Sequence, residues 1–274
     1  MNSIAIGPLI FSNDRFIAIL TVLSLFAVSE IIAWRRRADR DSIRWWATAI
    51  FVIWIITARL GYIIAHWDAF VHAPWTIFAI WQGGFDTRAG TFGLGATIFA
   101  AFLSRSKSGF PVLISVLAAS AVFALATLFL PDEARGKIPG GDFADLSGAP
   151  VTPANRDGRP LVLNLWATWC PPCRREMPMM IDVAGSAEGV EVLFANQGEE
   201  EIIIKRFLDL TDLPSHGMIR DPANTLMQKF GLLGLPSTLF FAADGSLQAV
   251  HTGEISRAAL LAGIKDLKGT DNED

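Results

Sequence analysis

The chain has 274 residues, of which 51% are hydrophobic and 18% charged, and its formal net charge at pH 7 is −4. This acidic balance, without a basic patch interleaved with aromatic residues, argues against a nucleic-acid partner. The apolar residues are unevenly spread, because long apolar stretches dominate up to Leu130 and an ordinary soluble mixture follows Pro131. The break predicts an N-terminal membrane half and a C-terminal globular half large enough for one core.

Four segments of the first half are apolar enough to cross a bilayer, which takes about 20 residues per helix. They are residues 16–34, 45–66, 90–103 and 110–130, and the third is short and rich in glycine. The first does not read as a cleavable signal peptide, because no basic segment precedes it and Arg35-Arg36-Arg37 follows it. We therefore expect a helical membrane domain of about four spans over residues 1–131, a Pro/Gly-rich linker over 132–141 and a globular domain over 142–274.

The positive charges predict the orientation of these spans. The arginine triplet, with Arg40 and Arg44, lies between the first and second spans, and Arg105 and Lys107 lie between the third and fourth. The positive-inside rule places both short loops in the cytoplasm. Everything after Pro131 then faces the opposite side, which in a bacterial inner membrane is the periplasm, where a disulfide can persist.

Cys170 and Cys173 are the only cysteines, and they stand in the sequence Trp-Cys-Pro-Pro-Cys. A short apolar run that predicts a buried strand precedes them, and the first turns of a predicted helix follow. Strand, Cys-x-x-Cys and helix in this order indicate a thioredoxin-type redox site. Two alternatives compete: a structural disulfide, which would close little chain and stabilise little, and a zinc site, which would need two more ligands nearby. We expect neither a metal nor a cofactor.

The rest of the second half alternates between strand and helix patterns. Apolar runs and an Asp-Gly hairpin signal predict strands, and helical spacing of apolar residues predicts amphipathic helices. The predicted strands are residues 161–166, 190–195, 237–242 and 246–251, and the predicted helices are residues 172–184, 199–210, 222–230 and 255–267. This pattern indicates a small α/β sheet with helices on both faces.

Residues 164–178, which read NLWATWCPPCRREMP, resemble the active-site segment of the TlpA/ResA-type thioredoxins. Gly-Leu-Pro-Ser-Thr at 234–238 is similar to the second signature of that family, and Asp-Gly at 244–245 matches its hairpin turn. The likeness covers roughly residues 141–267. It implies a thioredoxin fold, membrane-tethered thiol-disulfide oxidoreductase activity in the bacterial periplasm, and a cis Pro236 lying against the disulfide.

The chemistry needs a thiolate, because thiolates and not thiols attack disulfides. Cys170 begins the helix, where free backbone N–H groups and the macrodipole favour negative charge, so we assign it as the nucleophile. Cys173, one turn further on, is expected to be buried and to resolve the mixed disulfide. Pro171 and Pro172 lack N–H donors, which leaves the thiolate less stabilised and favours a reductase, although Arg174 and the arginine after it act in the opposite direction.

Two further positions bear on proton transfer. Glu199 matches the position of an active-site glutamate that helps proton transfer at the buried cysteine in ResA-type proteins. The alternative is that Glu199-Glu200-Glu201 only supplies the acidic first turn that a helix favours. Many thioredoxins carry a buried Asp where this chain has Asn164, and an amide cannot accept a proton, so the resemblance leaves that step to Glu199 or to water.

In the membrane half, residues 58–62 (ARLGY) and 81–90 (WQGGFDTRAG) resemble two stretches of prolipoprotein diacylglyceryl transferase. The chain departs from that family because it has Arg88 where the family has histidine, and because the later arginine-rich catalytic signature is absent. The half is therefore interpreted as a truncated relative without transferase chemistry. Arg59 and Arg88 are candidates for binding a lipid phosphate; the alternative is a structural salt bridge to Asp68 or Asp86.

Three hypotheses follow for the whole chain. The first is a membrane-anchored periplasmic thiol-disulfide oxidoreductase whose substrates are disulfide-bearing periplasmic or secreted proteins, such as those of cytochrome c biogenesis. It requires a separate membrane electron donor, because the membrane half has no cysteine. The second is a lipid-binding or lipoprotein-maturation factor whose thioredoxin half keeps a substrate cysteine reduced. The third, a redox-inert peptide-binding scaffold, is disfavoured by the intact Cys-x-x-Cys.

Overall fold

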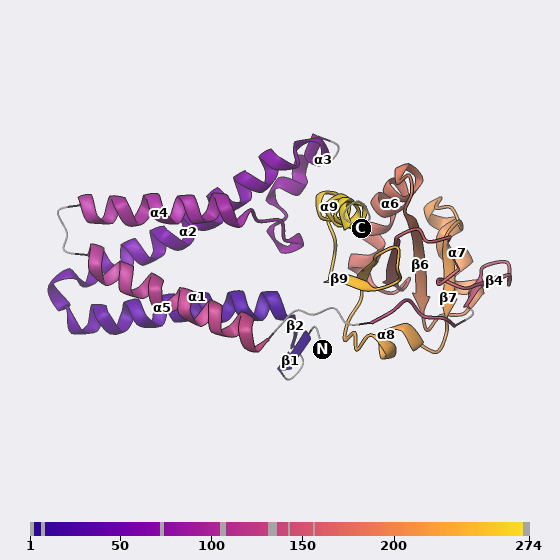
Figure 1. Ribbon diagram of the computed structural model, residues 1–274, viewed down its shortest axis with the longest axis horizontal. Coiled ribbons are helices and arrows are strands. Elements are labelled where there is room, and N and C mark those ends of the chain that lie inside the picture. Colours follow the sequence, from indigo (N-terminus) through magenta and orange to yellow (C-terminus); the bar gives the residue numbers. More distant parts are fainter. Residues whose placement is uncertain are drawn as a thin grey trace. The chain divides into compact units, whose positions relative to one another are not determined.

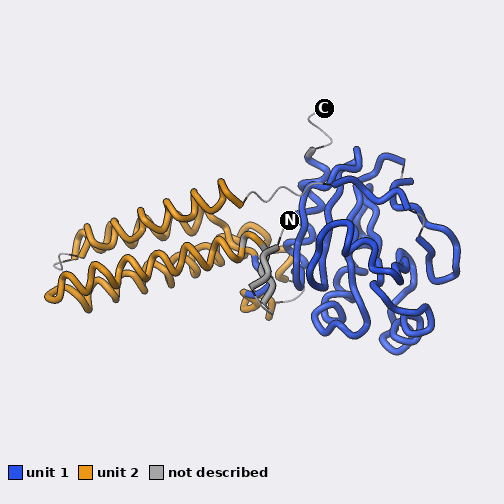
Figure 2. The backbone as a smooth tube through the Cα atoms, turned by 90° about the horizontal axis from the view of Figure 1, so that it is seen from below, with its two compact units in different colours: residues 1–10, 81–83, 133–274 blue, residues 11–80, 84–132 orange. Residues whose placement is uncertain are grey.

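The computed structural model describes residues 3–6, 9–71, 74–104, 108–130, 136–141, 143–155 and 157–270. Arg105, Lys107 and residues 131–135 of the expected linker region lie outside the described residues. The chain divides into two compact units, one made of Met1–Ile10, Trp81–Gly83 and Glu133–Asp274 and the other of Phe11–Ile80 and Gly84–Asp132 (Figure 2). Each unit is described by itself.

The N-terminal part of the chain is helical. Its four main helices are α1 (Asn13–Arg35), α2 (Arg40–Ala65), α4 (Thr87–Leu103) and α5 (Gly109–Phe129). The remaining elements are short: β1 (Ser3–Ile6) and β2 (Leu9–Ser12), which form a two-stranded sheet, α3 (Trp67–Val71), and the 3-10 turns η1 (Arg37–Asp39), η2 (Pro74–Phe78) and η3 (Ile80–Gln82). In Figure 1, α4 runs along α2 and α5 runs along α1.

Three segments are long and apolar enough to cross a membrane, namely Arg15–Arg35, Arg37–Ala65 and Gly109–Phe129. The third segment predicted to span, α4, is a helix of 17 residues and is shorter than these three. Its small residues pack closely on α2, since a Cβ added to Gly93 would lie 2.3 Å from Thr57 Oγ1. Gly93 thus leaves room for a side chain of α2, which a larger residue would displace.

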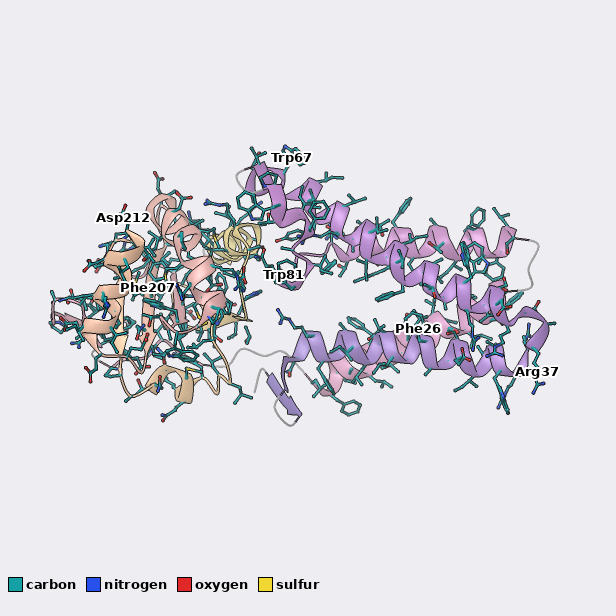
Figure 3. All side chains as sticks on the ribbon, turned by 180° about the vertical axis from the view of Figure 1, so that it is seen from behind. Phe26, Arg37, Trp67, Trp81, Phe207 and Asp212 are labelled. Carbon is teal, nitrogen blue, oxygen red and sulfur yellow. A yellow bond between two sulfur atoms is a disulfide. The ribbon has the colours of Figure 1, made fainter. Side chains whose placement is uncertain are left out.

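The four main helices bury a small apolar cluster and expose many large apolar side chains. Leu25, Ile50, Val112, Val116 and Ala119 form the cluster. Large exposed residues such as Phe92 and Leu128 point away from it, as expected of a surface that faces lipid. Arg37, from the basic stretch that predicts the orientation, lies at the turn between α1 and α2 (Figure 3).

The C-terminal part contains a seven-stranded sheet in the order β4-β3-β7-β6-β5-β8-β9. The central strands β5, β6 and β7 are parallel, and the other neighbours are antiparallel. The strands are β3 (Phe143–Asp145), β4 (Pro150–Val151), β5 (Leu161–Trp166), β6 (Glu191–Gln197), β7 (Met218–Asp221), β8 (Ser237–Phe241) and β9 (Leu247–Thr252). The helices are α6 (Pro171–Ser186), α7 (Glu201–Thr211), α8 (Thr225–Lys229) and α9 (Arg257–Thr270).

Successive side chains of a strand point to opposite faces of the sheet, so the buried residues form two clusters, one on each face. Val162 and Trp166 of β5 face one cluster, with residues of α6, α7 and α9. Leu163 and Leu165 face the other, with Leu226 of α8. The predicted α/β sheet with helices on both faces is confirmed. The sequence did not predict β7 or the β3–β4 pair, which are four residues or shorter.

Candidate redox site

The two cysteines lie where a parallel strand leads into a helix. β5 ends at Trp166, a short loop follows, and Cys170 is the N-cap residue of α6, so the predicted strand, Cys-x-x-Cys and helix are confirmed. The Sγ of Cys170 accepts a hydrogen bond from the backbone N–H of Cys173 over 3.3 Å. Cys170 and Cys173 are joined by a disulfide, with their Cα atoms 5.3 Å apart. The nucleophile position therefore has a helix N-terminus directly behind it.

The disulfide is more deeply covered than we expected. Cys173 is 0% exposed, as predicted, but Cys170 is only 2% exposed. Both belong to the same apolar cluster as Trp166 and Met177. Trp169, which directly precedes Cys170, is 67% exposed.

Few neighbouring groups are available to stabilise a negative charge on the sulfur of Cys170. Pro171 and Pro172 are the first two residues of α6 and provide no N–H. The guanidinium carbon of Arg174 lies 5.7 Å from the centre of the Phe207 ring. Arg175 forms an ion pair with Glu254 over 2.5 Å. Both arginines are thus engaged with other groups.

Pro236 lies directly before β8, and the Leu235–Pro236 peptide bond is cis, as the resemblance predicts. Ser237 pairs with Leu165 of β5, so Pro236 lies at the edge of the sheet from which the cysteine loop leaves. The side chain of Leu235 packs against the cluster that contains both cysteines. Within the described residues the backbone of Leu235 makes no hydrogen bond, which leaves it able to pair with an extended peptide.

Glu199 lies between β6 and α7 and binds the loop that carries the cysteines. Its carboxylate accepts hydrogen bonds from the backbone N–H of Thr168 over 2.7 Å and from the Thr168 hydroxyl. Asn196 Nδ2 donates a third over 2.7 Å. The structure therefore brings Glu199 to the active-site segment, where it holds the residue two positions before Cys170.

A second carboxyl group lies under the site, and sequence reasoning missed it. Glu176, one turn after Cys173 on α6, is 3% exposed. Its Oε1 accepts a hydrogen bond from Asn164 Nδ2 over 3.0 Å, and its Oε2 accepts one from the backbone N–H of Ile255 over 2.8 Å. Asn164 Nδ2 also donates to Thr238 Oγ1 over 3.1 Å.

Burial raises the pKa of Glu176 to about 7, against the hydrogen bonds from Ile255 and Asn164, which lower it. A carboxyl group with a pKa near neutrality can both accept and return a proton at physiological pH. Glu176 is therefore a candidate proton acceptor, which the amide of Asn164 cannot be. Helical spacing could have identified Glu176, because it lies beside Met177 and before Met180 on the side of α6 that continues from Cys173 into the core.

In the helical part, Arg59 is 8% exposed and organises a loop. Nε donates to Ile77 O over 3.1 Å, Nη1 to Gly84 O over 3.0 Å and Nη2 to Thr76 O over 2.6 Å. Its guanidinium also lies 5.5 Å from the centre of the Phe70 ring. These partners are three backbone carbonyls and an aromatic ring.

Arg88 is exposed in the first turn of α4. It lines a hollow of about 710 Å³ along the outer face of that helix with Thr91, Phe92 and Phe99. A separate apolar cavity of about 400 Å³ lies between α1, α2, α4 and α5, with Leu25 and Trp54 in its wall. Arg88 is thus placed beside an apolar surface, whereas Arg59 is turned into its own loop.

No group of three or more His, Cys, Asp or Glu side chains that could bind a metal occurs within the part of the chain that the structure describes.

Comparison with known families divides the chain in the same two parts. Residues 135–250 match the AhpC/TSA family, and residues 10–140 match prolipoprotein diacylglyceryl transferase. The second match extends beyond the two stretches in which the resemblance is visible by eye.

Individual relatives match the C-terminal part. Thiol-disulfide oxidoreductase ResA of Halalkalibacterium halodurans is 35% identical over 40% of this chain and 62% of the relative. The chain thus covers less than two thirds of that protein. ResA of Bacillus cereus is 27% identical over 60% of this chain and 99% of the relative. A solved thiol:disulfide interchange protein from Chlorobium tepidum is 23% identical, with a TM-score of 0.44 over 50% of this chain and 98% of that chain.

These relatives support a thiol-disulfide oxidoreductase. Together with the cysteine site, they show a thioredoxin-like domain in the C-terminal half that matches the AhpC/TSA family and has ResA-type homologues, and an N-terminal helical part that is similar to prolipoprotein diacylglyceryl transferase.

Proposed function

We propose that the chain is a membrane-anchored thiol-disulfide oxidoreductase that reduces disulfides of proteins in the bacterial periplasm. The observation that carries this proposal is the Cys170–Cys173 disulfide at the N-terminus of α6, with the carboxyl of Glu176 buried one turn further on. Nucleophile, resolving sulfur and proton acceptor then all lie on one helix.

The reaction begins with Cys170 as a thiolate. It attacks one sulfur of the substrate disulfide, the substrate bond breaks, and the departing sulfur takes a proton from water. Cys173 then gives its proton to the Glu176 carboxylate and attacks Cys170 Sγ. The second substrate sulfur leaves as a thiolate and is protonated in turn. The substrate has gained two electrons, and the Cys170–Cys173 disulfide has formed.

The direction of electron flow is argued from the stabilisation of the thiolate. The only backbone donor to Cys170 Sγ among the described residues is the N–H of Cys173, since the two intervening residues are prolines. Arg174 and Arg175 are engaged with Phe207 and Glu254. A weakly stabilised thiolate makes the dithiol a better reductant, so we infer a reductase.

The kind of substrate and the need for an electron donor are argued from the residues near the disulfide and from the number of cysteines. The unpaired backbone of Leu235, next to Pro236, favours an extended segment of a protein substrate over a small thiol. Regeneration needs a separate membrane dithiol donor, because the chain has two cysteines in all. Three segments that are long and apolar enough to cross a membrane and the basic turn at Arg37 support anchoring in the inner membrane with the thioredoxin-like domain in the periplasm.

The test uses the full chain in detergent micelles. The reduced protein should reduce insulin disulfides, and the Cys170→Ser variant should not. The Cys173→Ala variant should accumulate mixed disulfides in cells, with periplasmic proteins as the trapped partners. A redox potential close to that of a strong oxidant would contradict the reductase direction, and a cytosolic C-terminal reporter would contradict the location.

A second candidate, a lipid-binding or lipoprotein-maturation factor, is supported by one observation in the helical part. The apolar cavity of about 400 Å³ has room for part of an acyl chain, and Arg88 lies on the outer face of α4, which also contributes to that cavity. Phospholipid that copurifies with the protein and is lost in Arg88→Ala would favour it. A set of trapped Cys173→Ala partners rich in lipoproteins would join both candidates in one function.

A further inference from the structure

Two hydrogen-bond donors hold the carboxyl of Glu176, one from a strand and one from a connecting segment. Asn164 belongs to the central strand β5 and donates to Oε1 over 3.0 Å. The backbone N–H of Ile255 donates to Oε2 over 2.8 Å, and Ile255 lies in the segment between β9 and α9. That segment is outside any helix or strand, and it is held at Gly253, whose N–H donates to Pro236 O over 2.8 Å. A further interaction fixes Glu254, the residue directly before Ile255.

An ion pair between the neighbouring residues provides this interaction. Arg175 precedes Glu176 on α6, and Glu254 precedes Ile255. Both Nη2 and Nε of Arg175 donate to Glu254 Oε2, over 2.5 Å and 3.1 Å. Two consecutive residues of the helix are thus bound to two consecutive residues of the segment. Displacement of Glu254 from Arg175 would also displace the Ile255 amide from Glu176.

We propose that the Arg175–Glu254 ion pair positions Glu176 for proton exchange with the cysteines by keeping the Ile255 amide on its carboxylate. The inference rests on the proposed function, in which Glu176 accepts the proton of Cys173. Arg175 and Glu254 are positioning residues, since they act on the reaction through Glu176.

Several other groups surround this carboxyl. β5 and β8 present Asn164 and Thr238, which do not titrate. β9 presents His251, whose Nε2 lies 3.3 Å from the backbone oxygen of Glu254. α6 carries the two cysteines on the same helix. The ion pair therefore contributes the nearest permanent charges, and it contributes one of each sign.

A charge effect and a positioning effect predict different outcomes. The charge of Arg175 lowers the pKa of Glu176, that of Glu254 raises it, and the Ile255 amide lowers it. If only charge mattered, Arg175→Glu would raise the pKa and Glu254→Arg would lower it. If the pair positions the amide, each single reversal raises the pKa because the amide is released. The combined reversal then restores the pair and the original value.

The measurement is the pH dependence of the single-turnover reaction of the reduced full chain with 5,5′-dithiobis(2-nitrobenzoate), in detergent micelles. The inflection due to Glu176 is the one that Glu176→Gln lacks. We expect Arg175→Glu and Glu254→Arg each to move it upward by about one pH unit, and the double reversal to return it. Arg257→Glu is the matched control, because it breaks the ion pair between Arg257 of α9 and Asp182 of α6, which does not include Glu176.

A variant that keeps the charge gives a second test that does not depend on whether the charge reversals fold. Arg175→Lys retains the positive charge but loses the paired donors, so it should also move the inflection upward. Shifts of opposite sign in the two reversals, or an unmoved inflection, would overturn the inference. So would a wild type that exchanges disulfides without any inflection due to Glu176, and that result would leave the proposed function standing. Absence of exchange in the wild type would defeat both.

Discussion

Asn164 Nδ2 lies 3.0 Å from Glu176 Oε1, and this contact joins the central strand of the sheet to the helix that carries both cysteines. The amide provides a donor to the carboxyl but no proton acceptor. The sequence left proton transfer to Glu199 or to water, because Asn164 replaces the acidic residue of many thioredoxins. The acidic group is present and is supplied by the helix.

Glu176 should make the stability of the protein depend on pH. Its pKa is raised from 4.5 to about 7 in the folded state. The folded protein therefore binds the proton more tightly than the unfolded chain does. The stabilisation that comes from proton binding to Glu176 is fully present below pH 4.5. It is lost as pH rises through about 7, which lowers the free energy of unfolding by about 3 kcal/mol.

Glu176→Gln removes this dependence, and Asn164 Oδ1, which has no partner among the described residues, can accept the new N–H. Denaturant unfolding of the oxidised wild type and variant between about pH 4 and pH 8 checks the prediction. The free energy of unfolding of the variant should exceed that of the wild type at high pH only. A difference that is constant with pH would contradict it.

Asn164→Asp should be tolerated at low pH and destabilising at high pH. The substitution places a second carboxyl about 3 Å from the first, in a buried site where only one of the two can ionise readily. We expect a loss of about 2–4 kcal/mol at pH 8 and a much smaller loss at pH 5. Asn155→Asp, at an exposed position, is the control and should change little at either pH.

Glu199→Ala should loosen the loop before Cys170. The substitution leaves the Thr168 amide and hydroxyl without their acceptor. We expect a loss of about 1–3 kcal/mol in the free energy of unfolding, together with slower attack of reduced Cys170 on a model disulfide. Glu200→Ala, at the exposed neighbouring position, should do neither. Wild-type values for both quantities in Glu199→Ala would show that the loop does not depend on this carboxylate.

Arg59→Lys should destabilise the helical part without changing the amount of phospholipid that copurifies with the protein. A compact ammonium group cannot reach three carbonyls that the planar guanidinium binds at once. We expect faster proteolysis within residues 74–84 and a loss of about 2 kcal/mol. Arg88→Lys is the comparison, because Arg88 lies on the exposed face of α4. Loss of copurifying phospholipid in Arg59→Lys with unchanged proteolysis would instead indicate a phosphate ligand.

The parts of the site that are local in sequence could be predicted. The cysteine pair, the strand before it, the helix after it and the proline loop each carry their own signal within a few residues. The environment of Glu176 is not local, since it depends on Asn164, 12 residues away, and on Ile255, 79 residues away. In the sequence RREMP this glutamate looks like one more surface charge.

In the helical part, too, features that are local in sequence could be predicted and contacts between distant residues could not. Three of its spans follow from length and composition alone. The 17-residue helix α4 has fewer apolar residues because Gly93 meets Thr57 of α2 across a close contact, which the sequence does not reveal. Arg59 is similar, because its three carbonyl partners lie 17 to 25 residues away in the chain, and no local pattern pairs them with the arginine.

The single disulfide also limits how much work one molecule can do before it must be recharged. Two sulfurs hold one pair of electrons, and no reserve exists elsewhere in the chain. In the proposed reductase, every substrate disulfide reduced would need one encounter with a dithiol donor, so the supply of that donor would set the ceiling on flux, however abundant the protein is.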